Sequence, residues 1–342
     1  MQPIRCLAAA VAYLAVLAAP SAAGLPGLPL PVQQEGAVYR VLHWVLALWL
    51  VREINSLLNA WAENNWIFRS GKGSWDWPQE TAVVTGGAGG IGAIVVQRLL
   101  SHGVTVAVLD VQPLSDIFTP EERKRIKLYH CDVSSPDAVH KAAEALRSDH
   151  ASPSILINNA GIGRGNTILE TPPERLQRVM GINLLSQWYT IQEFLPDMLK
   201  KRKGHIMSTA SMSAFVAMAG QADYAATKAG LMALHESLTA ELKHLYKCPE
   251  IKTTVVFPTW TRTALTAPLE KGIRSSGAAM VDPKDVAELM VSQILAAKGG
   301  RLIWDPIGVV PAIRALPIWA QALIHDHLAQ VAIGNEITGI AK

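Results

Sequence analysis

The stretch TAVVTGGAGGIG, residues 81–92, joins a β-branched apolar run to a cluster of glycines. The run Thr81–Thr85 predicts a buried strand, and a helix is predicted to begin shortly after the glycines. A glycine-rich turn in this place lets backbone approach a pyrophosphate, which the first amides of the helix can bind. Gly86, Gly90 and Gly92 would form the turn. A tight turn without a ligand is the alternative interpretation, because a glycine cluster alone is a weak signal.

Further apolar runs follow this stretch, mostly separated by helix-like segments. They are residues 104–110, 126–132, 154–161, 204–211, 252–258 and 299–304. Near-continuous β-branched strands between helices indicate a parallel sheet that is covered on both faces. No repeat or long linker interrupts residues 75–305, so we expect a single α/β domain there.

Composition excludes several classes of function. The chain has 342 residues, half of them apolar, and a net charge of only +3 without a dense basic stripe. We therefore expect no nucleic-acid partner. Three scattered cysteines, Cys6, Cys131 and Cys248, are too few for a disulfide framework or a zinc site, and we predict no bound metal.

Residues 1–70 differ from the rest of the chain. Arg5 precedes a thirteen-residue apolar run and a PSAAG motif, which together resemble a signal peptide, and a second apolar stretch spans residues 41–51. Trp44 and Trp49 lie in that second stretch, and tryptophan favours the membrane–water interface. Two interpretations remain open: a cleaved leader followed by a buried helix, or an uncleaved anchor followed by a re-entrant or interfacial helix.

The C-terminal tail, residues 306–342, spaces bulky apolar residues at helical intervals, although Pro311 and Pro317 interrupt the pattern. This spacing predicts an amphipathic helix. Its apolar face could contact a membrane, form a dimer contact or pack on the domain.

Two acidic residues are expected beside the glycine turn. Asp110 ends the second predicted strand, where a carboxylate can hydrogen-bond a ribose 2′-hydroxyl and repel a 2′-phosphate. Ala93, rather than arginine, follows Gly92, and no arginine is adjacent to Asp110. These features favour NAD over NADP. Asp132 ends the third predicted strand and would suit the adenine edge.

A tyrosine and a lysine lie four positions apart in DYAATKAG, residues 223–230, where they would share one helix face. A lysine ammonium near Tyr224 favours its phenolate, so Lys228 can lower the pKa of a catalytic phenol. Ser211, at the end of the fifth predicted strand, could hold a substrate oxygen, and we prefer it to Ser208 and Ser213 on its spacing. Asn183, on an earlier helix, could hold a water for proton relay. The alternative is that the pair has no catalytic role, with a core tyrosine beside a solvated lysine.

Taken together, these motifs resemble the short-chain dehydrogenase/reductase family. The resemblance rests on TGGAGGIG, Asp132, NNAG at 158–161, Asn183, Ser211 and YAATK, in family order over about 230 residues. It implies a doubly wound (Rossmann) parallel sheet of about seven strands, a nicotinamide cofactor and a catalytic tetrad. In that tetrad Tyr224 is the general acid/base, Ser211 orients the substrate oxygen, Lys228 also holds the ribose, and Asn183 anchors the relay water.

The resemblance also implies a set of cofactor contacts. These are Gly86, Gly90, Ile91, Gly92, Asp110, Asp132, Val133, Asn159, Tyr224, Lys228, Thr261 and Thr263.

A narrower resemblance comes from HESLTAEL at 235–242, the apolar N-terminus and the RALPIW tail. These resemble the membrane-associated branch with retinol dehydrogenases and lipid-droplet 17β-hydroxysteroid dehydrogenases. The branch implies an uncleaved anchor to the endoplasmic reticulum or lipid droplets and a small apolar substrate such as a retinoid, steroid or long-chain lipid. The wider family implies a homodimer through the two long helices that carry Asn183 and Tyr224. The expected function is NAD(H)-dependent interconversion of a hydroxyl and a carbonyl. The alternatives are an NADPH-dependent carbonyl reductase and a non-catalytic NAD-binding protein of lipid surfaces.

One position departs from the family pattern. Thr259 stands in PTWTRT, residues 258–263, where the family usually has a glycine after the proline, while Thr263 keeps its usual place. We therefore expect cofactor binding to be retained and Trp260 to narrow the mouth of the site or contact the membrane. The loss of the glycine leaves the backbone geometry of this loop open.

Overall fold

A seven-stranded sheet forms the centre of the main domain, with the strand order β3-β2-β1-β4-β5-β6-β7. The computed structural model describes residues 32–67, 71–149, 152–163, 165–304 and 310–334. All neighbouring strands pair in parallel. The strands are β1 Thr81–Thr85, β2 Thr105–Asp110, β3 Ile126–His130, β4 Ile155–Asn158, β5 His205–Thr209, β6 Lys252–Phe257 and β7 Gly300–Ile303.

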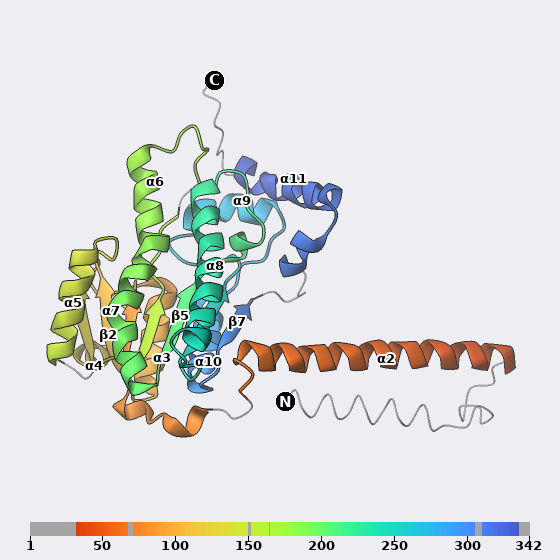
Figure 1. Ribbon diagram of the computed structural model, residues 1–342. Coiled ribbons are helices and arrows are strands. Elements are labelled where there is room, and N and C mark those ends of the chain that lie inside the picture. The colour runs from red at the N-terminus through yellow and green to blue at the C-terminus, as the bar shows by residue number, and fades with distance from the viewer. Residues whose placement is uncertain (1–31, 68–70, 150–151, 164, 305–309, 335–342) are drawn as a thin grey trace. The chain divides into compact units, whose positions relative to one another are not determined.

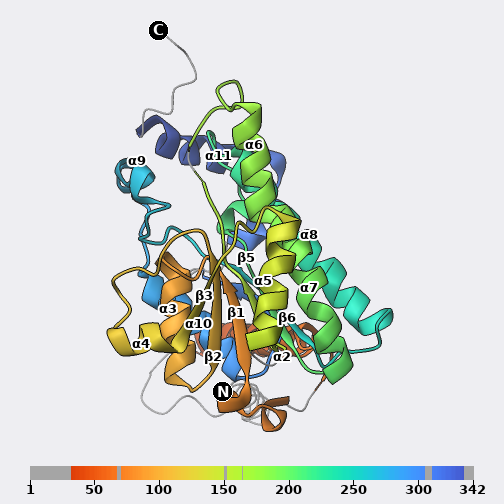
Figure 2. The same cartoon turned by 90° about the vertical axis from the view of Figure 1, so that its left-hand side faces the viewer.

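Helices cover both faces of the sheet (Figures 1 and 2). Around α3 and α10 lies one buried apolar cluster, and around α5, α7 and α8 lies a second on the opposite face. The α-helices of this unit are α3 Gly90–Ser101, α4 Pro120–Arg125, α5 Pro136–Asp149, α6 Pro173–Met180, α7 Ser186–Lys201, α8 Ala222–His244, α9 Glu270–Ser275, α10 Pro283–Leu295 and α11 Ile318–Gly334, and α2 Val32–Glu63 belongs to the separate N-terminal unit. This arrangement confirms the predicted doubly wound parallel sheet.

The chain reverses its direction of travel across the sheet between β1 and β4, which are neighbours although β2 and β3 separate them in sequence. The loops that leave the two strands therefore diverge at this point, which is where open α/β sheets generally bind ligands. The glycine turn follows β1 and the NNAG motif begins in β4, so both lie at this switch point. β3 ends at His130, two residues before the predicted end at residue 132. Its neighbour β2 ends at Asp110, which pairs with His130, so no further residue of β2 is available for pairing.

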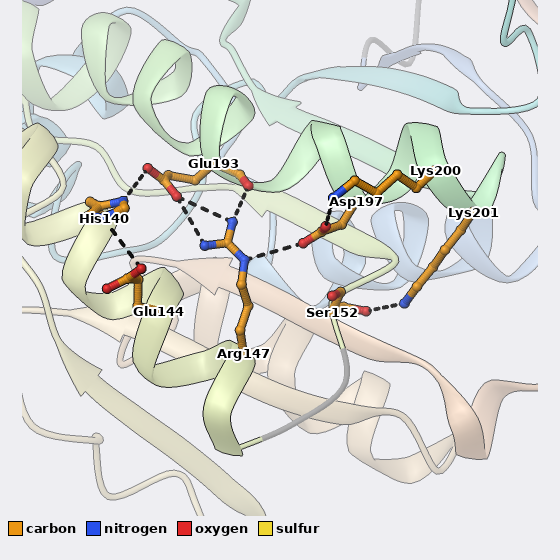
Figure 3. Close-up of polar contacts among 8 residues, drawn as sticks. All are labelled: His140, Glu144, Arg147, Ser152, Glu193, Asp197, Lys200 and Lys201. Carbon is orange, nitrogen blue, oxygen red and sulfur yellow. Dashed lines mark hydrogen bonds and ion pairs between the residues drawn. The ribbon is translucent and has the colours of Figure 1, made fainter.

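An ion-pair network fastens α5 to α7 (Figure 3). Arg147 donates to the Glu193 carboxylate at 3.3 Å and to the Asp197 carboxylate at 3.3 Å, and His140 Nδ1 lies 2.9 Å from Glu193 Oε1. A second contact pairs His140 Nε2 with Glu144 at 3.7 Å. Since α7 continues directly from the turn that holds Asn183, the network helps fix one side of the site.

The N-terminal unit contributes α2, a 32-residue helix. Among the described residues, Arg40–Glu63 is the helix that is long and apolar enough to cross a membrane, with a mean hydropathy of 1.4. Its bulky side chains are exposed, including Trp44 at 66 % and Leu48 at 67 %. The signal-peptide-like segment predicted around residues 6–24 lies outside the described residues.

In the C-terminal tail, helix α11 packs against α9 and has two faces (Figures 1 and 2). Val331 is buried with Leu269 and Ile273, while Ile318, Trp319 and Leu323 are largely exposed. Helix α11 therefore packs on the domain, which is one of the three roles that the spacing of apolar residues in the tail allowed. Its exposed apolar side chains form a surface that the described residues do not cover. The division of the chain at residues 70, 75 and 305 remains a prediction.

Candidate active site

The glycine turn after β1 has no room for side chains. Gly86 has φ +64°, and a Cβ there would lie 2.7 Å from Ala160 Cα. A Cβ on Gly92 would lie 2.2 Å from the Gly86 carbonyl oxygen and 2.5 Å from Asn159 Nδ2. Real Cβ atoms do not approach other atoms this closely, so the turn packs on the end of β4 only because these two residues are glycine.

The other side of the turn is open and fits a pyrophosphate. A Cβ on Gly89 would meet nothing within 4 Å, and one on Gly90 would meet only Thr263 Cγ2, at 3.9 Å. Gly89 is the N-cap of α3, and no side chain caps the first amides of this helix. Unpaired amides at the positive end of a helix bind phosphate oxygens. Gly89 and Gly90 thus leave an open cradle in front of these amides.

Hydrogen bonds tie the glycine turn to the neighbouring strands. Asn159 Nδ2 donates to the Gly86 carbonyl at 3.1 Å, and the Thr85 hydroxyl accepts from the amides of Asn159 and Ala160, both at 3.1 Å. Asp110 Oδ2 accepts from the Ala88 amide at 3.0 Å, so its carboxylate stands at the rim of the cradle. Ile91 is partly buried against the core below the turn.

Asp132 lies two residues beyond β3 and is exposed. Its Oδ1 accepts from the Ser134 amide at 3.0 Å and from the Ser134 hydroxyl at 2.7 Å, and these bonds lower the pKa of Asp132. The next residue, Val133, is buried. The two residues therefore stand farther along the same edge of the sheet, at the end of the strand beyond β2.

Tyr224 lies in the first turn of α8 beside the loop that follows β5. Ser211 caps the short helical turn in this loop, and its hydroxyl donates to Ser213 Oγ at 3.2 Å. Burial raises the pKa of Tyr224, and a hydrogen bond with the Ser211 side chain partly opposes that rise. The serine that the spacing favoured is thus the one that contacts the phenol.

Lys228 lies one helical turn after Tyr224, and its ammonium is 5.4 Å from the centre of the phenol ring. Its Nζ donates to the Thr209 carbonyl at 2.7 Å, and the residue is only 4 % exposed. Burial lowers the pKa of Lys228 to about 8. The cation is therefore held in place and poorly solvated beside the phenol, where its field acts with little screening.

Asn183 is fully buried in a π-helical turn, Gly181–Leu185, between α6 and α7. Its Oδ1 accepts from the Ile162 amide at 2.8 Å, and its Nδ2 donates to the Ile162 carbonyl at 2.8 Å and to Thr227 Oγ1 at 3.3 Å. The Thr227 hydroxyl in turn donates to the Tyr224 carbonyl at 2.7 Å. The Asn183 side chain thus clamps the loop after β4 to the helix that carries Tyr224.

The loop after β6 closes the site on the side of the glycine turn. Thr261 forms a β-bridge with Val281, and the Thr266 hydroxyl donates to the Thr261 carbonyl at 2.5 Å. The non-glycine residues with positive φ in the described part of the chain are Asn65, Trp66, Arg202, Lys247 and Ala297. Thr259 is not among them. The φ of Thr259 is therefore outside the left-handed region, where a glycine would have been favoured.

The predicted site residues therefore gather at one edge of the sheet, at the ends of β1, β2, β4, β5 and β6 and on the helical segments beside them, with Asp132 and Val133 at its margin. Sequence reasoning missed Thr85, Thr227 and Gly163. Thr227 lies inside YAATK, but its side chain is important only because Asn183 reaches it from another helix. Gly163 packs on Tyr224: a Cβ there would lie 3.0 Å from Tyr224 Cδ2.

Comparisons with known proteins agree on one family. The family model described as short chain dehydrogenase matches residues 80–274. Dehydrogenase RED2 of Cochliobolus heterostrophus is 34 % identical over 252 residues, which are 74 % of this chain and 93 % of that protein.

Two further proteins resemble the chain more locally or in fold. Human retinol dehydrogenase 10 is 40 % identical over 139 residues, so the match covers 41 % of this chain and only 40 % of that protein. A 3-ketoacyl-(acyl-carrier-protein) reductase from Brucella melitensis, solved in complex with NADH, is 25 % identical with a TM-score of 0.59. That alignment covers 66 % of this chain and 96 % of the reductase.

Proposed function

The chain belongs to the short-chain dehydrogenase family, and on this premise we propose that it interconverts a hydroxyl and a carbonyl on an apolar substrate with NAD(H). Family membership makes it an oxidoreductase of CH–OH groups with a nicotinamide dinucleotide. The choice of NAD, the apolar substrate and the residue roles below are our proposals.

One observation carries the proposal: an open phosphate cradle and a Tyr224–Lys228 pair lie at the same edge of one sheet. The cradle follows β1, and the Lys228 ammonium is fixed to the Thr209 carbonyl at the end of β5. β1 and β5 are the two neighbours of β4 in the sheet, so only β4 separates the cradle from the Tyr224–Lys228 pair. A dinucleotide held by its pyrophosphate would extend along this edge toward the phenol.

Cofactor binding would use the glycine turn and the acid beside it. The first amides of α3 would hold the pyrophosphate, and Asp110 would accept a hydrogen bond from the adenosine ribose. A carboxylate there repels a 2′-phosphate, and the residues after it, Val111 and Gln112, add no positive charge to attract one. This favours NAD, with an NADPH-dependent reductase as the rival.

For alcohol oxidation, the bound nicotinamide supplies the hydride acceptor. Ser211 Oγ would hold the substrate oxygen, while Tyr224 Oη takes the hydroxyl proton. The Lys228 ammonium favours the phenolate through its charge. In the reductive direction Tyr224 returns the proton to the substrate oxygen.

Asn183 would support proton relay by holding the backbone around the site in place. Its side-chain groups are already paired with Ile162 and Thr227, so they hold the loop after β4 in place. A π-helical turn interrupts the regular i→i−4 ladder and leaves main-chain carbonyls for other donors. We assign the relay water to such a carbonyl in the turn of Asn183 rather than to its side chain.

We further propose that the protein works at a membrane, in the endoplasmic reticulum or on lipid droplets, and that it forms a homodimer. The apolar helix Arg40–Glu63 supports membrane attachment, as does the local similarity to retinol dehydrogenase 10. Sedimentation of the full chain with membranes after an alkaline carbonate wash tests attachment, and release into the supernatant would contradict it.

Tyr224→Phe tests the proposed reaction. Loss of a general acid/base lowers rates about 100- to 10,000-fold, so NAD reduction with apolar alcohols should fall by that range while NADH still binds. Tyr246→Phe is a matched control, because Tyr246 lies beyond the far end of α8. Wild-type turnover by Tyr224→Phe would refute the mechanism. Tight NADH binding by the wild-type protein, without turnover of any alcohol tested, would instead support a non-catalytic NAD-binding protein.

A further inference from the structure

One edge of the Tyr224 ring is bordered by a glycine and a leucine from two distant loops. A Cβ on Gly163 would lie 3.0 Å from Tyr224 Cδ2, 3.4 Å from Cε2 and 3.6 Å from Leu265 Cδ1. Cε2 is bonded to the ring carbon that carries the hydroxyl. The Gly163 backbone, the edge of the phenol ring and the Leu265 methyl therefore lie close together beside the reacting group.

Leu265 is held firmly in this position. The Thr266 hydroxyl donates to the Thr261 carbonyl at 2.5 Å, and the Thr263 amide donates to Thr266 Oγ1 at 3.2 Å, which closes the loop on both sides of Leu265. The Arg262 amide donates to the Val281 carbonyl at 3.0 Å and joins the loop to the segment before α10. A side chain on a loop with this many internal bonds forms a wall with a fixed position.

Gly163 is held from the opposite side. The neighbouring Ile162 exchanges two backbone hydrogen bonds with the buried Asn183 side chain, and the Asn166 amide donates to the Gly220 carbonyl at 2.8 Å. The two walls cannot easily move apart, since one is fixed to the core through Asn183 and the other through Val281.

We propose that Leu265, facing Gly163, is a specificity-determining residue that limits the substituents on the reacting carbon. The protein would then act on unhindered primary alcohols and aldehydes, and it would discriminate against secondary alcohols and ketones. The inference rests on the proposed function, because it assumes that the substrate oxygen meets Tyr224 and Ser211. A secondary alcohol carries one more carbon substituent on the carbon whose oxygen faces the phenol, and that substituent would meet the Leu265 methyl.

The test compares kcat/KM for a primary alcohol and its secondary isomer, 1-decanol and 2-decanol, with NAD and the purified full chain. A single misplaced carbon in an apolar pocket changes kcat/KM about 10- to 200-fold. The wild-type protein should prefer 1-decanol by that factor, and Leu265→Ala should lower the preference at least tenfold by raising turnover of 2-decanol. Leu245→Ala, at an exposed leucine after the far end of α8, is the matched control and should leave the ratio unchanged.

Gly163→Ala supplies the opposite perturbation. Its φ is not positive, so alanine adds steric bulk without backbone strain. Because the new methyl would lie 3.0 Å from Tyr224 Cδ2, turnover of both alcohols should fall, and the ratio should shift further toward 1-decanol. Equal turnover of both alcohols by the wild-type protein, or an unchanged ratio in Leu265→Ala, would overturn the inference and leave the proposed function standing. Failure to reduce NAD with any alcohol, in a protein that binds NADH, would refute the proposed function and the inference with it.

Discussion

Lys228→Met removes the ammonium beside the proposed catalytic phenol while keeping an unbranched apolar chain in a buried position. The expected result is an alkaline shift of the pH–activity profile, because the phenolate of Tyr224 loses its nearest cation. The Lys228 ammonium lies 5.4 Å from the centre of the phenol ring, and with an effective dielectric constant of about 20, unit charges at roughly that separation attract each other by about 3 kcal/mol. This corresponds to roughly a 100-fold loss of kcat/KM near neutral pH, which should diminish as the pH approaches 10.

The same substitution should change the pH dependence of folding stability. Burial lowers the pKa of Lys228 from 10.5 to about 8 in the folded protein. Between these values the unfolded chain keeps a proton that the native state has released, so the stability of the wild-type protein rises with pH there. Between pH 8 and pH 10.5 the deprotonation of Lys228 raises the free energy of unfolding by up to about 3 kcal/mol. Lys228→Met should lack that rise.

The assay is kcat/KM for alcohol oxidation from pH 6 to pH 10, together with urea unfolding at the same pH values. Lys228→Met also loses the hydrogen bond to the Thr209 carbonyl, which lowers stability at every pH, so the informative quantity is the slope with pH. Lys252→Met is the control: burial also lowers the pKa of Lys252, yet this residue begins β6 at the opposite edge of the sheet.

Lys252→Met should change the pH dependence of the unfolding free energy and leave the pH dependence of kcat/KM unaltered. A pH–activity profile of Lys228→Met that is scaled down but not shifted would refute the electrostatic role. Lys228 would then serve only to position the site.

Three further predictions concern the cradle and the helix contacts. Asp110→Ala should reduce the preference for NAD over NADP about 10- to 100-fold, the worth of hydrogen bonds to a charged group; an unchanged kcat/KM ratio would exclude Asp110 as the ribose reader. Gly92→Ala places a Cβ 2.2 Å from a carbonyl oxygen, so NADH affinity should fall and stability should drop by about 1–3 kcal/mol. Gly73→Ala, where a Cβ meets nothing within 4 Å, should change neither quantity. A hydrogen bond with Glu193 raises the pKa of His140, so its stabilising effect is complete below about pH 6.5 and disappears as the pH rises through the folded value. The urea midpoint of His140→Gln should differ from that of the wild-type protein below pH 6.5 and match it well above; a pH-independent difference would contradict the ion pair.

The fold could be predicted because its signals are local. A run such as Thr81–Thr85 is continuous and β-branched, and all five of its residues are buried, as a central parallel strand requires. The glycines of the next turn stand where backbone approaches backbone, and their spacing is visible without knowledge of their partners. The proposed catalytic pair is local for the same reason, since residues four apart on α8 share a face.

What the sequence could not supply depends on contacts between distant segments. The partners of the Asn183 side chain are one example: both ends of its amide are bonded, to Ile162 and to Thr227, and neither partner is near it in the chain. Leu265 reaches Gly163 across about a hundred residues, in a stretch without helical or strand periodicity. Such pairs become visible only once the strand order has brought the loops after β4 and β6 to the same edge of the sheet.

Burial alone works against the proposed chemistry, because it raises the pKa of Tyr224 and lowers that of Lys228. The hydrogen bond with Ser211 opposes the first effect but does not overcome it. Without a cofactor, the protein therefore favours a neutral phenol at Tyr224 and makes the ammonium of Lys228 easier to deprotonate. Such a site removes a proton from an alcohol poorly. A further positive charge close to the phenol would favour the phenolate, and an oxidised nicotinamide would bring that charge. On the proposed mechanism, the burial of Tyr224 and Lys228 would thus make proton removal depend on the oxidation state of the nicotinamide bound at the cradle.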